Sequence, residues 1–91
     1  MKTDGPSWDE LEVLGIQIGA RWKKLGRRLG IEDAVLYEID LVNEELSQKG
    51  YQLLRRWRAQ KGSDATYQAL YDALTNRFVG RSDLAEKYCR D

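Results

Sequence analysis

Charged side chains are the groups in this sequence with the clearest capacity to bind a partner, because they gather in blocks of one sign. Residues 21–30 and 46–61 each carry five basic and no acidic side chains, and residues 31–45 carry six acidic and no basic ones. The signs balance over the whole chain, which has 15 basic and 15 acidic residues. A neutral protein with separate patches of both signs is suited to docking on a copy of itself or on a relative.

Catalytic and metal-binding chemistry lacks its usual side chains. The chain has no His and one cysteine, Cys89, which excludes Ser-His and Cys-His nucleophile pairs, His-ligated metals, an internal disulfide and a cysteine-based zinc cluster. Lys87 and Arg90 could lower the pKa of the nearby Cys89 thiol, but without a base or a second cysteine we interpret this residue as incidental. We therefore predict no enzyme activity and no cofactor, metal or small-molecule substrate.

The charged blocks are expected to lie on helices of one small domain. A chain of 91 residues allows a single domain, and its helical periodicity, few β-branched residues and single proline, Pro6, indicate an all-α fold. We expect residues 1–6 to form a flexible lead and residues 7–91 to form the domain. No apolar run approaches the roughly 20 residues that span a bilayer, so we predict no membrane insertion. One cysteine and no signal peptide favour a cytoplasmic location.

Three helices are predicted in the first half of the chain. Ser7 and Glu10 have the capping-box spacing that starts a helix, and Gly19 is expected to end it. A second helix is predicted over residues 21–29 and a third over residues 33–41, with short loops between them.

Three further helices are predicted in the second half, each with a polar residue at its start. Asn43 is the expected N-cap of the fourth and longest helix, Ser63 or Asp64 that of the fifth, and Ser82 or Asp83 opens a short sixth. Helical spacing of the apolar residues predicts which side chains face a common core. These are Leu11, Leu14, Ile18, Trp22, Leu25, Leu29, Leu36, Ile39, Leu54, Trp57, Leu70, Leu74, Leu84 and Tyr88.

Five segments of the sequence resemble motifs of the death-domain family. In chain order they are WKKLGRRLGI at 22–31, Leu36 with Ile39, LLRRW at 53–57, Gly62 and Ala65-Thr66 with Leu70 and Leu74 downstream, and DLAE at 83–86. The resemblance covers about residues 8–89 and implies a six-helix antiparallel Greek-key bundle without catalytic activity. It implies homotypic binding to receptor or adaptor death-domain proteins in apoptotic or NF-κB-type signal transduction. It extends to adaptor-like and ankyrin-like members alike.

Two glycines depart from the family pattern. Gly26 stands where Ala is usual, and Gly50 stands where Val or Ala usually faces the core. A glycine inside a helix costs about 0.5–1 kcal/mol relative to Ala, so we expect the start of the fourth helix to be looser. The Gly15/Gly19 and Gly26/Gly30 spacings are interpreted as helix ends, because no 20-residue apolar helix accompanies them.

The basic candidate contacts lie on the second and fourth helices. With Trp22 facing inward, the basic side chains of the second helix lie on its flanks and outer face, and Arg55 and Arg56 lie about 130° from the inward direction of the fourth helix. Arg58 is expected at the boundary of the core. Simple solvation of these helix faces is the alternative. The basic contacts predicted are Lys23, Lys24, Arg27, Arg28, Arg55 and Arg56.

The acidic candidate contacts lie around the corner between the third and fourth helices. The positions of Glu32 and Asp33 are explained by the favourable dipole at a helix N-terminus. The positions of the remaining acidic residues are less well explained by helix capping. The acidic contacts predicted are Asp40, Glu44 and Glu45. The resemblance alone adds Asp64 and the loop over residues 76–82.

Two functions of different classes are compatible with these features. A homotypic interaction module, with other death-domain proteins as partners and self-association possible, uses both charge signs. A helical nucleic-acid-binding module would use the two basic helices, but the pI of about 6.3 and the acidic segments beside each basic block oppose it. We therefore predict protein partners and no nucleic acid.

Overall fold

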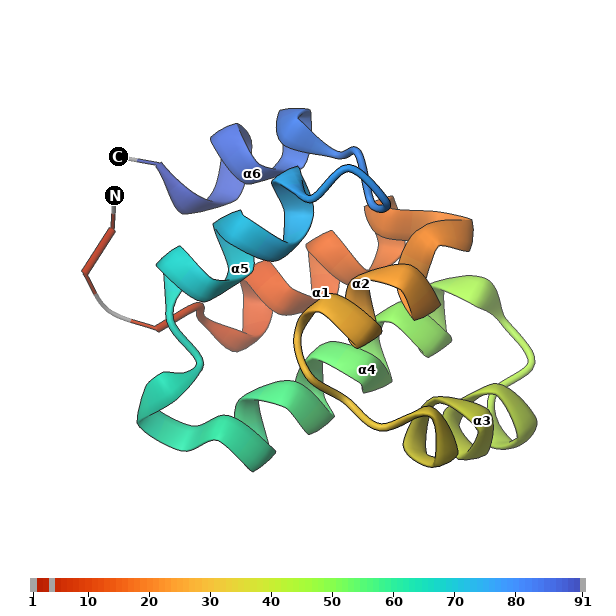
Figure 1. Ribbon diagram of the computed structural model, residues 1–91. Coiled ribbons are helices and arrows are strands. Elements are labelled where there is room, and N and C mark those ends of the chain that lie inside the picture. Colours follow the sequence, from red (N-terminus) through yellow and green to blue (C-terminus); the bar gives the residue numbers. More distant parts are fainter. Residues whose placement is uncertain (1, 4, 91) are drawn as a thin grey trace.

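Helices account for almost all of the regular structure in the computed structural model, which describes residues 2–3 and 5–90 (Figure 1). Its six α-helices and two 3₁₀ turns are α1 Trp8–Ile18, η1 Gly19–Arg21, α2 Trp22–Arg28, α3 Asp33–Val42, α4 Leu46–Lys61, η2 Gly62–Asp64, α5 Tyr67–Thr75 and α6 Ser82–Cys89. The predicted all-α, six-helix antiparallel Greek-key bundle is confirmed. Residues 1, 4 and 91, which fall in the expected lead and at the end of the expected domain, lie outside the described residues.

Helices α1 and α4 pack with their backbones in contact, and two glycines make this possible. A Cβ atom on Gly15 would lie 2.5 Å from the backbone nitrogen of Tyr51, and one on Gly50 would overlap the carbonyl oxygen of Gly15. The absence of a side chain on Gly50 therefore tightens the start of α4 against α1, the reverse of the looseness we expected. Gly15 is not a helix end either, since α1 continues to Ile18.

Helix starts follow the prediction at α1 and depart from it at α4 and α5. Ser7 and Glu10 form the expected capping box. Asn43 is not the N-cap of α4, because its side-chain amide donates to the carbonyl of Ile39 at 3.0 Å and closes α3 instead. Helix α4 begins only after Glu45.

The N-cap of α5 also lies later than predicted, by three residues from Ser63 or two from Asp64. Ser63 and Asp64 lie in the η2 turn and do not cap the helix. Thr66 is the N-cap, and its hydroxyl accepts a hydrogen bond from the amide of Ala69 at 3.1 Å. The turn uses the carbonyl of Asp64 to accept from the Thr66 amide at 2.9 Å. Ser82 does open α6, as its first residue.

One hydrophobic core joins all six helices. All but one of the side chains predicted to face it are buried, with Trp57 only 1% exposed, and Tyr88 is half-buried at its edge. No charged side chain of the described residues is buried in this core. The described part of the chain contains no helix long and apolar enough to cross a membrane. The core thus leaves the charged blocks on the outside of the helices.

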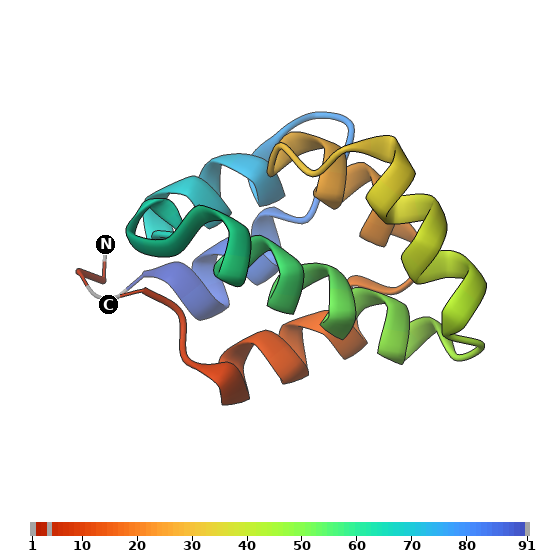
Figure 2. The same cartoon turned by 90° about the horizontal axis from the view of Figure 1, so that it is seen from below.

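The first and last described residues of the chain lie side by side (Figures 1 and 2). The backbone amide of Lys2 donates to the carbonyl of Cys89 at 3.1 Å, and the Lys2 ammonium forms an ion pair with Glu10 at 2.9 Å. Pro6 is fully buried. These described residues of the expected lead therefore contact α1 and α6.

Candidate protein-interaction surfaces

The basic side chains of α2 are partly neutralised by carboxylates of α3. The Lys23 ammonium lies 2.7 Å from an oxygen of Asp40, and the Arg27 guanidinium lies 3.1 Å from one of Asp33. Lys24 and Arg28 are exposed and form no ion pair with any described carboxylate. Half of the predicted basic contacts on α2 therefore already have an internal partner.

Asp40 connects three helices. Its second oxygen accepts from the Lys49 ammonium of α4 at 2.5 Å, so one carboxylate of α3 links α2 and α4. Hydrogen bonds from Lys23 and then Lys49 hold the pKa of Asp40 below its usual value. The carboxylate predicted as a partner contact thus has a role within the fold.

The corner between α3 and α4 is both acidic and apolar at its surface. Glu44 and Glu45 are exposed and pair with no described cation. The side chains beside them are Leu41, Val42 and Leu46, which are 67%, 73% and 44% exposed. We call residues 41–46 the acidic corner. It brings together two of the predicted contact residues with apolar neighbours that the charge pattern did not reveal.

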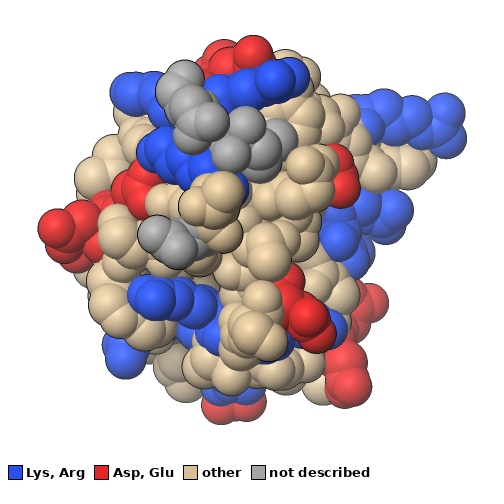
Figure 3. Space-filling view, turned by 90° about the vertical axis from the view of Figure 1, so that its left-hand side faces the viewer, with Lys and Arg blue, Asp and Glu red and all other residues tan. Residues whose placement is uncertain are grey.

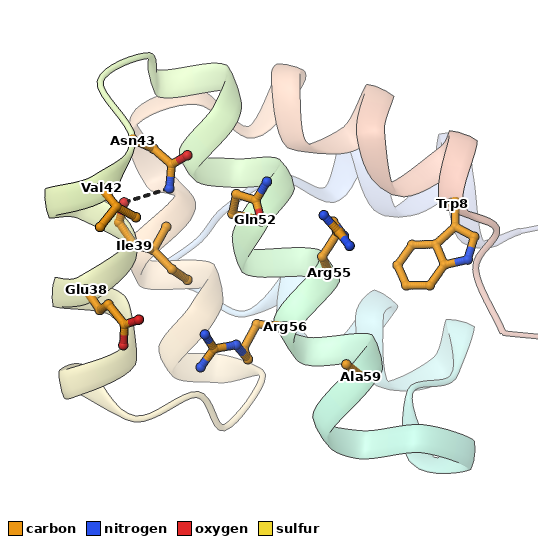
Figure 4. Close-up of a pocket in the computed structure, with 9 residues that line it drawn as sticks. All are labelled: Trp8, Glu38, Ile39, Val42, Asn43, Gln52, Arg55, Arg56 and Ala59. Carbon is orange, nitrogen blue, oxygen red and sulfur yellow. Dashed lines mark hydrogen bonds between the residues drawn. The ribbon is translucent and has the colours of Figure 1, made fainter.

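Arg55 and Arg56 line a groove over α4, the α3–α4 groove, in which Arg56 points toward α3 and Arg55 toward Trp8 of α1 (Figure 4). The groove has a volume of about 290 Å³. Its walls are Trp8, Glu38, Ile39, Val42, Asn43, Gln52, Arg55, Arg56 and Ala59. Both arginines are exposed, as predicted, and neither forms an ion pair with a carboxylate of the described chain. The walls combine apolar side chains and two arginines with one carboxylate, Glu38. The arginines and apolar side chains suit an acidic segment with an aliphatic or aromatic anchor.

Arg58 packs on Trp8, one of the residues that line this groove. Its guanidinium carbon lies 4.3 Å from the centre of the Trp8 ring, a cation–π contact between α4 and α1. Arg58 is half-buried, as expected for a boundary residue, and its Nη1 atom is buried without a hydrogen-bond partner in the described structure. The Trp8 ring is 47% exposed, so it also presents a free apolar surface.

A second basic surface contains an aromatic residue that the charge pattern did not identify. Phe78, in the loop between α5 and α6, is 51% exposed and lines a hollow of about 190 Å³ with Lys24, Arg27 and Arg28. Only the resemblance pointed to this loop, because a lone aromatic residue in a short loop has no periodic signal. Asp64, the other residue taken from the resemblance, is exposed in the η2 turn.

The face in Figure 3 carries charged side chains of both signs among the described residues. Basic and acidic side chains are scattered there among uncharged ones. Burial raises the pKa of Glu10, but hydrogen bonds from Tyr67 and Lys2 outweigh it and bring the value to about 2. Burial, with the Glu10 contact, raises the pKa of Tyr67 to about 12. This network joins α1 and α5 and serves stability.

Cys89 is unsuited to thiol chemistry. Its side chain is fully buried, and burial raises its pKa to about 11 despite the nearby Lys2. Reactive cysteines have lowered pKa values and are accessible to solvent. The interpretation as an incidental cysteine therefore agrees with its environment.

Comparison with known proteins names the family. The family model described as "Death domain" matches residues 9–90, nearly the whole chain. This chain belongs to the death-domain family, a class of protein-interaction modules. It is 34% identical over 83 residues to THO complex subunit 1 of Homo sapiens. The match covers 91% of this chain and 12% of that relative, so the chain spans about an eighth of the longer protein.

Proposed function

We propose that this death domain is a non-enzymatic module that assembles with other death-domain proteins through oppositely charged surfaces. One observation supports the proposal. Cations and carboxylates that form no ion pair within the described chain lie on neighbouring surfaces of α3, α4 and the loop between them. Arg55 and Arg56 supply the cations of the α3–α4 groove, and Glu44 and Glu45 supply the carboxylates of the acidic corner. Exposed ion pairs are weak singly, but a patch of them steers association and selects partners.

The family resemblance and the similarity to THO complex subunit 1 favour two different kinds of complex in which this chain could assemble. The family resemblance favours receptor or adaptor death domains in apoptotic or NF-κB-type signal transduction, with a cytoplasmic location. The similarity to THO complex subunit 1 favours a place as one subunit of a multi-subunit complex. In the first setting the partner is a second death domain, and self-association is a special case.

Protein partners are favoured over nucleic acid by the way the charges are arranged. Asp33 and Asp40 lie within ion-pair distance of the α2 cations, so the basic blocks do not merge into one continuous positive stripe. Continuous basic surface is what binds a phosphate backbone. Gel shifts on duplex and single-stranded DNA test the alternative, and low-micromolar binding with a steep salt dependence would support it.

The test is a pull-down from cell lysate, identified by mass spectrometry, with three forms of the chain. We expect the unaltered chain to capture a death-domain protein and the Arg55→Glu/Arg56→Glu variant to lose it. The Lys61→Glu/Lys87→Glu variant makes the same charge change elsewhere and is expected to retain it. Absence of any death-domain protein, or equal loss with both variants, would contradict the proposal.

A further inference from the structure

Phe78 is an exposed aromatic ring on a loop that is firmly held. The Asn76 side-chain oxygen accepts from the Phe78 amide at 2.9 Å, and the Asn76 carbonyl accepts from the amides of Val79 and Gly80 at 2.9 and 2.8 Å. Val79 is fully buried, and its carbonyl accepts from the Arg21 guanidinium at 2.5 Å. A half-exposed ring on a preorganised loop loses little conformational entropy when a partner covers it.

Cationic groups from two elements surround this ring. The guanidinium carbons of Arg28 and Arg77 lie 5.4 and 4.7 Å from the centre of the Phe78 ring. Lys24 and Arg27 complete the hollow beside it. Arg28 and Arg77 form no ion pair with a described carboxylate. We call Lys24, Arg27, Arg28, Arg77 and Phe78 the basic-aromatic site.

The composition of this site specifies its occupant. Aromatic and arginine side chains dominate binding hot spots. The Phe78 ring can bind an apolar side chain, and the unpaired guanidinium groups of Arg28 and Arg77 can bind carboxylates. A nucleic acid is a poorer fit, because Asp72 lines the adjoining hollow and its carboxylate would repel a phosphate backbone. A protein surface with exposed aliphatic and acidic residues fits better.

The acidic corner of this same chain has that composition. Leu41 and Val42 are more exposed than any other large apolar residues of the described chain, and Glu44 and Glu45 follow them directly. In a second copy, Leu41 and Val42 of the acidic corner can pack on Phe78. Glu44 and Glu45 can then pair with the cations around that ring. The site and the corner carry opposite charge and lie on different elements, so each copy can offer one of each.

We propose that the chain self-associates head to tail, with the acidic corner of one copy in the basic-aromatic site of the next. The inference rests on the proposed homotypic function and names one partner for it, a second copy of this chain. Because the two surfaces differ, the contact is heterologous, and it continues to a third copy unless the ring closes.

The test uses sedimentation velocity of the purified chain over a range of concentration. We expect average size to grow with concentration and the association to weaken at high salt. Arg28→Glu/Arg77→Glu and Glu44→Arg/Glu45→Arg should each raise the dissociation constant at least about tenfold. An equal mixture of these two variants restores opposite charges across the contact and should re-associate.

Three controls separate this inference from other outcomes. Arg55→Glu/Arg56→Glu makes the same charge change in the other groove and should still self-associate. Phe78→Ala removes no charge and should still weaken association. Circular dichroism verifies folding, and the single variants Arg77→Glu and Glu44→Arg replace any double variant that fails to fold.

Several results would overturn the inference. These are a chain that remains monomeric up to about 1 mM, a mixture of the two variants that does not re-associate, or tight binding of a single-stranded oligonucleotide that depends on Phe78. If the pull-down still captures a death-domain protein in an Arg55- and Arg56-dependent way, the homotypic function stands and only self-association is wrong.

Discussion

The basic side chains of α2 and the arginines of α4 belong to blocks of equal charge in the sequence, yet they differ in the folded protein. Lys23 and Arg27 are paired with carboxylates of α3, whereas Arg55 and Arg56 have no described carboxylate within ion-pair distance. The blocks therefore differ in what they can offer a partner. A count of charges along a chain does not give its surface potential, because tertiary contacts neutralise some charges and leave others free.

The largest expected effect comes from separating α1 and α4, the two helices that pack backbone against backbone at Gly15 and Gly50. Gly50→Ala places a methyl group against the carbonyl of Gly15, and overpacking of this kind costs about 1–3 kcal/mol or more. For a domain of this size we expect the melting temperature to fall by at least about 4 °C. Gln48→Ala, at an exposed position of the same helix, is the control. An unchanged melting temperature for Gly50→Ala would show that the helices move apart at little cost.

The dependence of stability on pH should reveal the contribution of the partly buried network formed by Glu10, Lys2 and Tyr67. The pKa of Glu10 is lowered from 4.5 to about 2 in the fold, so its contribution to stability is fully present above pH 4.5 and is lost as the pH falls toward 2. Glu10→Gln should cost about 1.5–3 kcal/mol at pH 7 and flatten the stability profile between these values. Urea unfolding at a series of pH values measures both. Parallel profiles for the two proteins would contradict a role for this network.

Neutralising paired and unpaired cations tests the difference between α2 and α4 directly. We expect Arg55→Gln/Arg56→Gln to weaken binding to a death-domain partner about tenfold, because these groups are free to bind. Lys23→Gln/Arg27→Gln should weaken it about twofold, since these groups first have to leave their internal partners. Isothermal titration calorimetry with the captured partner compares them. Equal losses would mean that the internal ion pairs open at no cost.

The smallest expected effect comes from a substitution that frees a paired cation of α2, so that α2 becomes more like the unpaired arginines of α4. Asp40→Asn removes the carboxylate that holds Lys23 and Lys49, so α2 should gain a free cation and bind an acidic partner slightly more tightly. Stability should fall slightly, and only above the pH at which the native carboxyl ionises, because hydrogen bonds from the two lysines lower its pKa. Calorimetry and thermal melts measure the two changes. Tighter binding without any loss of stability would show that the ion pairs do not support the fold.

Most of the fold could be predicted because the information is local. The spacing of Leu11, Leu14 and Ile18 identifies one face of a helix without any knowledge of what it packs against. The same reasoning failed at Asn43 and Asp64, since a polar residue between two helices can close the first or open the second. The hydrogen bonds made in the folded protein decide between these outcomes, and here the Asn43 amide donates back to the Ile39 carbonyl.

The candidate surfaces could be predicted only in part. The exposure of Arg55 and Arg56 follows from helix geometry. Glu44 and Glu45 were predicted as contacts from their place at the corner between the third and fourth helices, and they are exposed there. The Lys23–Asp40 pair joins side chains 17 positions apart, and no local pattern reveals such a pair.

The sequence by itself determined the six-helix family fold, the core and the presence of both charge signs, because periodicity and composition act along the chain. Only the tertiary structure decided which charges remain free and which aromatic residue stands among them. Ion pairs between helices, and the position of Phe78 beside Arg28, depend on how the helices pack. Such contacts join residues that are distant in the chain and therefore leave no trace in its local pattern.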